Sequence, residues 1–193
     1  MFSKGNLIRI AAVLALTLGL ATMASAQALN SGAQTITLNA TLAESLTLSL
    51  SANNVSFTLA AGSAANAGST NVTATTSWVL KPGRTAVGVY AYFASATAAL
   101  TDGAGDNIPS SAFFIADNAG PSTALTSSAA NTAGFGAAAA GLQLANVAVT
   151  GANKNSSRTD VMAFNINLTG GTLAQLPAAT YTGTLNIQAQ ATP

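Results

Sequence analysis

The fold class is decided by the stretch Thr-Ile-Thr-Leu-Asn-Ala-Thr-Leu, residues 35–42, and by its continuation Ser-Leu-Thr-Leu-Ser-Leu, residues 45–50. In both stretches every second residue is apolar, and Thr, Asn and Ser fill the positions between. This period of two places the apolar side chains on one face of a half-buried β-strand. One long bent strand or two successive strands would both fit. The apolar set is Ile36, Leu38, Ala40, Leu42, Leu46, Leu48 and Leu50.

Further strands are predicted along the chain, separated by turns rich in Gly, Pro and Asn. The segment Thr85–Phe93 is apolar on both faces, which indicates a central strand. The low-complexity segment Asn118–Gly141 is predicted to be a loop. About eight or nine short strands without a convincing helix predict an all-β fold, an antiparallel Ig-like or Greek-key β-sandwich. The remaining predicted strands are Val55–Leu59, Asn71–Leu80, Ala112–Ala116, Leu142–Val149, Met162–Leu168 and Tyr181–Ala189.

The first residues have the pattern of a secretory signal peptide. Lys4 and Arg9 precede an apolar run over Ile10–Leu20, and Ala24-Ser25-Ala26 provides a small-residue cleavage site before Gln27. We therefore predict a signal peptide over 1–26, an N-terminal strand over 27–43 and a β-sandwich domain over 44–193. The mature protein is expected to be secreted, at the cell surface or in the periplasm of a bacterium. No membrane span is expected after the signal is removed.

The amino-acid composition argues against catalysis, metal binding and nucleic-acid binding. The chain has no His, no Cys, 5 acidic and 6 basic residues, so the usual general bases, nucleophiles and metal ligands are scarce. We expect no enzyme activity, catalytic residue, cofactor or metal site. Without its signal the chain carries a net charge of about −1. It has no basic stripe, so nucleic-acid binding is not expected.

Two features remain as candidate sites. The segment 35–42 precedes a complete further set of strands, so it can leave its own domain and complete the sheet of a neighbour. The alternative is an ordinary first strand of its own domain. Trp78 is a candidate platform for a ligand such as a glycan, and its alternative is a core residue beside Tyr90 and Tyr92.

The two ends of the mature chain resemble bacterial chaperone/usher pilins, especially the class without cysteines. Those subunits follow the signal with a short alternating donor strand, as at Ile36–Leu42, and end in a Gly-Thr-Tyr-Ser-Gly-type strand, to which Pro177–Ile187 is similar. Spore coat protein U-type domains have a similar layout but usually carry cysteines. Trp78-Val79-Leu80 resembles the Trp-x-Leu tripeptide of WxL cell-wall domains, whose second copy is missing here. Each resemblance implies an exported, non-enzymatic β-domain.

The leading hypothesis is an exported structural subunit of a bacterial surface fibre or coat that assembles by β-strand donation. Ile36, Leu38, Ala40 and Leu42 would fill pockets of the acceptor. The expected partners are other copies or related subunits, and the resemblance implies a periplasmic chaperone. The alternative is a monomeric cell-surface module that binds cell-wall or other glycan.

Overall fold

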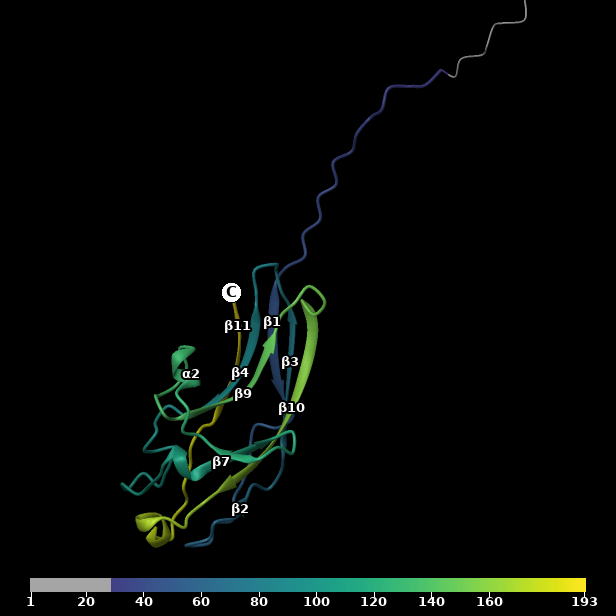
Figure 1. Cartoon of the computed structure of the whole chain (residues 1–193). Helices are drawn as coiled ribbons and strands as arrows, with labels where there is room; N and C mark the ends of the chain where they lie inside the picture. Colours follow the sequence, from purple (N-terminus) through teal and green to yellow (C-terminus); the bar gives the residue numbers. More distant parts are fainter. Residues whose placement is uncertain (1–28) are drawn as a thin grey trace, which may run out of the picture. The chain divides into compact units, whose positions relative to one another are not determined.

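The computed structural model describes residues 29–193, which contain an all-β domain with antiparallel sheets (Figure 1). The predicted signal peptide, residues 1–26, lies outside the described residues. Within the described residues, the stretch 29–41 and the stretch Leu42–Pro193 are two separate units. Every strand described below belongs to the second unit.

The larger sheet has the strand order β1-β3-β10-β7-β8, with β2 paired to β10. Leu46 of β1 lies opposite Trp78 of β3. The long strand β10 pairs with β3 along its first part and with β7 along its second. The strands are β1 (Ser45–Leu50), β2 (Asn66–Ala67), β3 (Val72–Val79), β7 (Phe113–Asp117), β8 (Ser122–Ala124) and β10 (Asn155–Ile166).

The smaller sheet has the order β11-β4-β9. Its central strand β4 is buried along its whole middle part. A two-stranded ribbon and three helices of at most five residues complete the described elements. The elements are β4 (Ala86–Tyr92), β9 (Gly141–Ala148), β11 (Asn186–Thr192), β5 (Leu100–Thr101), β6 (Asn107–Ile108), η1 (Ser110–Ala112), α2 (Ala129–Thr132) and η2 (Gly171–Gln175).

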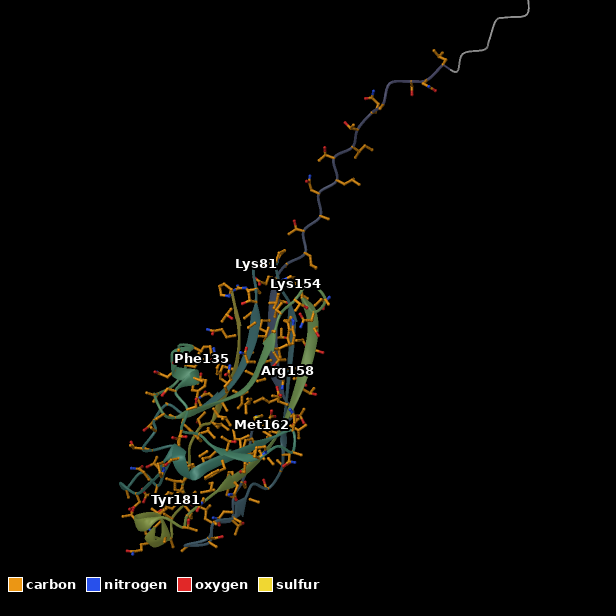
Figure 2. All side chains as sticks on the ribbon, viewed as in Figure 1. Lys81, Phe135, Lys154, Arg158, Met162 and Tyr181 are labelled. Atoms are coloured by element: carbon orange, nitrogen blue, oxygen red, sulfur yellow. The ribbon has the colours of Figure 1, made fainter. Side chains whose placement is uncertain are left out.

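The two sheets share one interior with two apolar clusters. The larger cluster combines residues of both sheets, among them Met162 of β10 and Ala91 of β4. The smaller cluster surrounds Trp78. On β3 the buried Thr76 stands between the two clusters, opposite Arg158 of β10. Figure 2 shows Arg158 and Met162 along β10. A polar layer therefore separates the two parts of the core.

The structure confirms the all-β, antiparallel class and most of the predicted strands. The apolar segment Thr85–Phe93 is the central strand β4 of its sheet. The alternating segment around Met162 becomes β10, whose inward residues Met162, Phe164 and Ile166 are buried. The described residues contain eleven strands, four of which have three residues or fewer, compared with the eight or nine predicted.

Several predicted elements differ in the structure. Residues 35–42 are predicted to be a strand, but they belong to no strand in the described part of the chain. The segment Val55–Leu59 makes only one bridge, from Phe57 to Gly68. The last strand begins at Asn186 rather than Tyr181, because Thr182 is already bonded to Thr101, at 2.9 Å in both directions. The segment predicted as a loop over 118–141 contains β8 and α2.

Candidate assembly surface

The N-terminal segment, defined here as residues 29–43, presents apolar side chains to solvent. Ile36 is 85% exposed, Leu38 88% and Leu42 82%, and Ala40 is exposed as well. The segment forms no helix or strand. Apolar area in water costs roughly 25 cal/mol per Å² relative to burial, so a chain of exposed, regularly spaced aliphatic residues is a candidate interaction site.

The two sheets end beside each other at β1 and β11. β1 is an edge of the larger sheet and β11 an edge of the smaller one, and the two strands are in contact (Figure 1). Leu46 and Leu48 on β1 and Ile187 on β11 are only partly buried, and Leu50 is 41% exposed. An unpaired strand edge with apolar side chains is a template for a further strand.

Charged residues meet at one end of this pair of edges. Arg84, in the turn between β3 and β4, donates from Nε to Glu44 Oε1 at 2.9 Å and from Nη1 to the carbonyl oxygen of Ala191 at 3.1 Å. Lys81 Nζ lies 3.8 Å from Glu44 Oε2. The hydrogen bond from Arg84 is the main cause that lowers the pKa of Glu44 below its ordinary value. The carboxylate that precedes β1 is thus tied to β11 through Arg84.

Trp78 lies in the core. Its side chain is 3% exposed, it packs with Leu80, Val87 and Val149, and its Nε1 donates to the carbonyl oxygen of Asn153 at 2.8 Å. A ring buried in this way has no free face on which a sugar can stack. The core interpretation of Trp78 therefore holds, and the platform interpretation does not fit its burial.

A shallow hollow of about 420 Å³ lies on the outer face of β1, β3 and β10. Trp78 and Ser156 are among its lining residues, and no charged residue lines it. Of its hydroxyl groups, Thr47 Oγ1 donates to Ser77 O at 3.4 Å. The lining side chains on this face are Ser45, Thr47, Ser77, Val79, Asn155 and Ser157.

An ion pair between the partly exposed Arg158 and the buried Asp160 lies in the polar layer of the core. Arg158 Nε donates to Asp160 Oδ2 at 2.8 Å, and the Asp160 side chain is 0% exposed. Asn118 Nδ2 donates to both Asp160 and Asp117, at 3.2 Å each. Burial, and then the charge of Asp160, raise the pKa of Asp117 above its ordinary value. The arrangement joins the β7–β8 turn to β10.

Residues 29–193 contain neither a membrane-spanning helix nor a cluster of metal-ligating side chains. In this part of the chain no helix is long and apolar enough to cross a membrane. Within the same residues no three His, Cys, Asp or Glu side chains gather in a group that could hold a metal ion.

The sequence pattern identified the apolar residues of the N-terminal segment but not the contacts between the ends of β1 and β11. Glu44 and Arg84 were missed because they are 40 positions apart. Only 6% of the chain is charged. The presence of both Lys81 and Arg84 in the turn after β3 was therefore the one sequence signal that this turn has a charged partner.

Comparisons of the chain with protein-family models, with curated proteins and with solved structures gave no match.

Proposed function

We propose that this protein is an exported structural subunit of a bacterial surface fibre or coat, and that it assembles by donating its N-terminal segment as a β-strand to another copy. The observation that carries the proposal is the exposure of Ile36, Leu38 and Leu42, at 82% or more each. Their segment alternates like a strand but belongs to no strand among residues 29–193.

The strand order supports an acceptor site on the same protein. In a constant-type Ig sandwich four strands A-B-E-D face a sheet C-F-G. The order β1-β3-β10-β7 corresponds to the first sheet, and β4-β11 corresponds to C-F, while β9, on the other side of β4, has no counterpart in the constant-type order. We therefore propose an Ig-like sandwich in which none of the strands within residues 29–193 pairs with β11 on the side away from β4. A strand donated by another copy would occupy that position.

The energetics favour occupation of this position. Burial of a Leu or Ile side chain contributes about 1.5–3 kcal/mol, and the new ladder satisfies backbone groups along the edge. Ordering the segment costs roughly 1–2 kcal/mol for each residue fixed. Burial of four side chains and the ladder hydrogen bonds offset this cost only if all four side chains enter the acceptor in one register. These are the side chains of Ile36, Leu38, Ala40 and Leu42.

The proposed partners follow from the same surface. An edge that stays open before assembly invites aggregation, and weak net charge gives little electrostatic protection. A periplasmic chaperone that covers the edge of an exported subunit would prevent this. Other copies of the chain, or related subunits with the same alternating segment, are the final occupants.

The proposal is tested by deleting residues 27–42. The shortened protein should stay folded and monomeric, because the unit that remains contains every strand and both core clusters. A synthetic peptide of residues 27–43 should bind it and raise its melting temperature. A matched peptide with Leu38→Asp should not, since a charge would face the core. Unfolding of the shortened protein, or equal binding of both peptides, would contradict strand donation.

The hollow on the outer face of β1, β3 and β10 favours the alternative function, a monomeric module that binds neutral glycan. Its uncharged hydroxyl and amide groups match the hydrogen-bonding groups of a sugar. Titration of the full chain with neutral polysaccharides separates the two functions. A concentration-independent monomer whose binding is lost with Ser77→Glu would support the glycan module instead of the fibre subunit.

A further inference from the structure

The hydrogen bonds of β11 show which of its backbone groups point away from β4, toward the free edge of the strand. Thr192 O accepts a hydrogen bond from Thr85 N, at 2.9 Å, on the side of β4. Successive carbonyl groups of a strand point in opposite directions. Ala191 O therefore points away from β4, toward the free edge. By the same alternation the backbone groups of Ile187 and Ala189 also face that edge.

One of these edge positions is already occupied. Arg84 Nη1 donates to Ala191 O at 3.1 Å, while Nε of the same guanidinium holds Glu44 Oε1 at 2.9 Å. We call this arrangement of Glu44, Arg84 and Ala191 the clasp. It joins the residue before β1 to the last part of β11, so it closes one end of the edge between them.

The composition makes the clasp unusual. Charged residues make up 6% of the chain, yet Glu44, Lys81 and Arg84 meet at this one end. Figure 2 shows Lys81 at the end of the domain opposite Tyr181. A charged group at a strand edge is a known way to limit unwanted pairing. Here the charge stands at one end and leaves the edge at Ile187 and Ala189 open.

We propose that the clasp sets the register of the strand that β11 accepts. This inference rests on the proposed function. With Ala191 O occupied, an incoming strand pairs along Ile187 and Ala189 and stops at the guanidinium. Without Arg84, a strand shifted by two residues would find an additional carbonyl and would keep the same face toward the core, since strand side chains repeat every two residues. Arg84 is thus a positioning residue for assembly.

Disulfide trapping tests the register, because the chain has no cysteine of its own. Full-length chains with Gln188→Cys, an exposed outward position on β11, are mixed with full-length chains that carry one cysteine in the N-terminal segment. Disulfides require Cβ atoms about 3.5–4.5 Å apart, so each pair reports one register. The four segment positions are Thr35, Thr37, Asn39 and Thr41.

With Arg84 present, one segment position should dominate the crosslinks. In Arg84→Ala chains the position two residues away should rise by about fivefold, which corresponds to the ~1 kcal/mol of one hydrogen bond. Lys81→Ala is the matched control: it removes a positive charge from the same turn, and Lys81 has no hydrogen bond to β11. It should keep the original profile.

The outcomes separate the two proposals. The same crosslinking profile in Arg84→Ala and unchanged chains would overturn the clasp as a register stop and leave strand donation standing. A shift in Lys81→Ala equal to that in Arg84→Ala would also overturn it, because charge alone would then explain the effect. Crosslinks at no segment position above those of a Gln143→Cys chain, on the opposite edge strand β9, would overturn strand donation itself.

Discussion

The N-terminal segment and β1 have the same sequence pattern and different structures. Both alternate aliphatic residues with Thr, Ser or Asn. In β1, Leu46 lies opposite Trp78 and is partly buried against the smaller core cluster. In the segment, Leu38 is 88% exposed and belongs to no strand.

The comparison shows that alternation and pairing are separate properties. Alternation fixes which face of a strand is apolar, and it is visible in a single stretch of sequence. Pairing needs the edge of another strand. For β1 that edge belongs to β3, and paired residues such as Leu46 and Trp78 are far apart in the sequence. The segment has the same pattern but belongs to no strand in the described part of the chain, and we propose that a second copy supplies the edge with which it pairs.

The largest effect on the free energy of unfolding is expected from a contact within residues 44–193 that does not involve the N-terminal segment. Arg158→Met should lower the free energy of unfolding by about 3 kcal/mol, because it leaves the buried Asp160 without its cation. Arg158→Met with Asp160→Leu should cost much less, since no charge is then left buried. Urea unfolding of the mature chain measures both. Equal losses for the single and the double variant would show that packing, not charge, is responsible.

The next effect compares the two alternating stretches directly. Leu46→Ala should lower the free energy of unfolding by about 2 kcal/mol, because Leu46 packs against Trp78 and its neighbours. Leu38→Ala should change the free energy of unfolding of the dilute monomer by about 0.5 kcal/mol or less. Denaturant titration below the concentration of assembly gives both values. Similar losses at the two positions would mean that the segment pairs within its own chain.

A smaller effect is expected from pH. Burial and the charge of Asp160 raise the pKa of Asp117 above its ordinary value of 3.8. The folded state therefore favours the protonated form, and Asp117 adds stability below that value which is lost as the pH rises through its raised pKa. Asp117→Asn has no such titration. Its stability relative to the unchanged chain should increase with pH over this window, and a flat difference would contradict the assignment.

The smallest effect lies in the β7–β8 turn, which is independent of the segment. Asn118 and Ala119 have φ of 50° and 59°, and Gly120 N donates to Asp117 O at 2.8 Å. Such a turn favours Gly at its second central position. Ala119→Gly should raise the melting temperature by an amount that corresponds to about 0.5–1 kcal/mol. The gain should be the same with and without residues 27–42; a gain in only one protein would link the turn to the segment.

Much of the fold was readable from local pattern. The segment Thr85–Phe93 was assigned to the centre of a sheet because both of its faces are apolar, and β4 has that place. The low-complexity residues after Asp117 gave no such signal. Phe135 nevertheless stacks on Tyr92, with ring centroids 5.8 Å apart. This contact depends on tertiary packing, which the periodicity of the sequence does not predict.

The site was predictable on one side only. The apolar face of the N-terminal segment follows from the two-residue period, whereas the edge of β11 and the clasp depend on residues that are distant in sequence. Glu44 and Arg84 are separated by 40 positions, and Arg84 and Ala191 by 107. Local propensity carries no information on such pairs. The Arg158–Asp160 pair was missed for a related reason, since its burial is set by the strands on either side of β10.

The most direct test of the central claim is amide hydrogen exchange of residues 35–42 in the full mature chain. Amide protons exchange slowly only when they are held in stable hydrogen bonds. The account predicts fast exchange at these positions in the dilute monomer and strong protection once the chain is concentrated enough to assemble, with the amides of Ile187 and Ala189 protected in the same transition. Protection of residues 35–42 that is already complete in the dilute monomer would contradict the claim, because the segment would then be an ordinary first strand of its own domain.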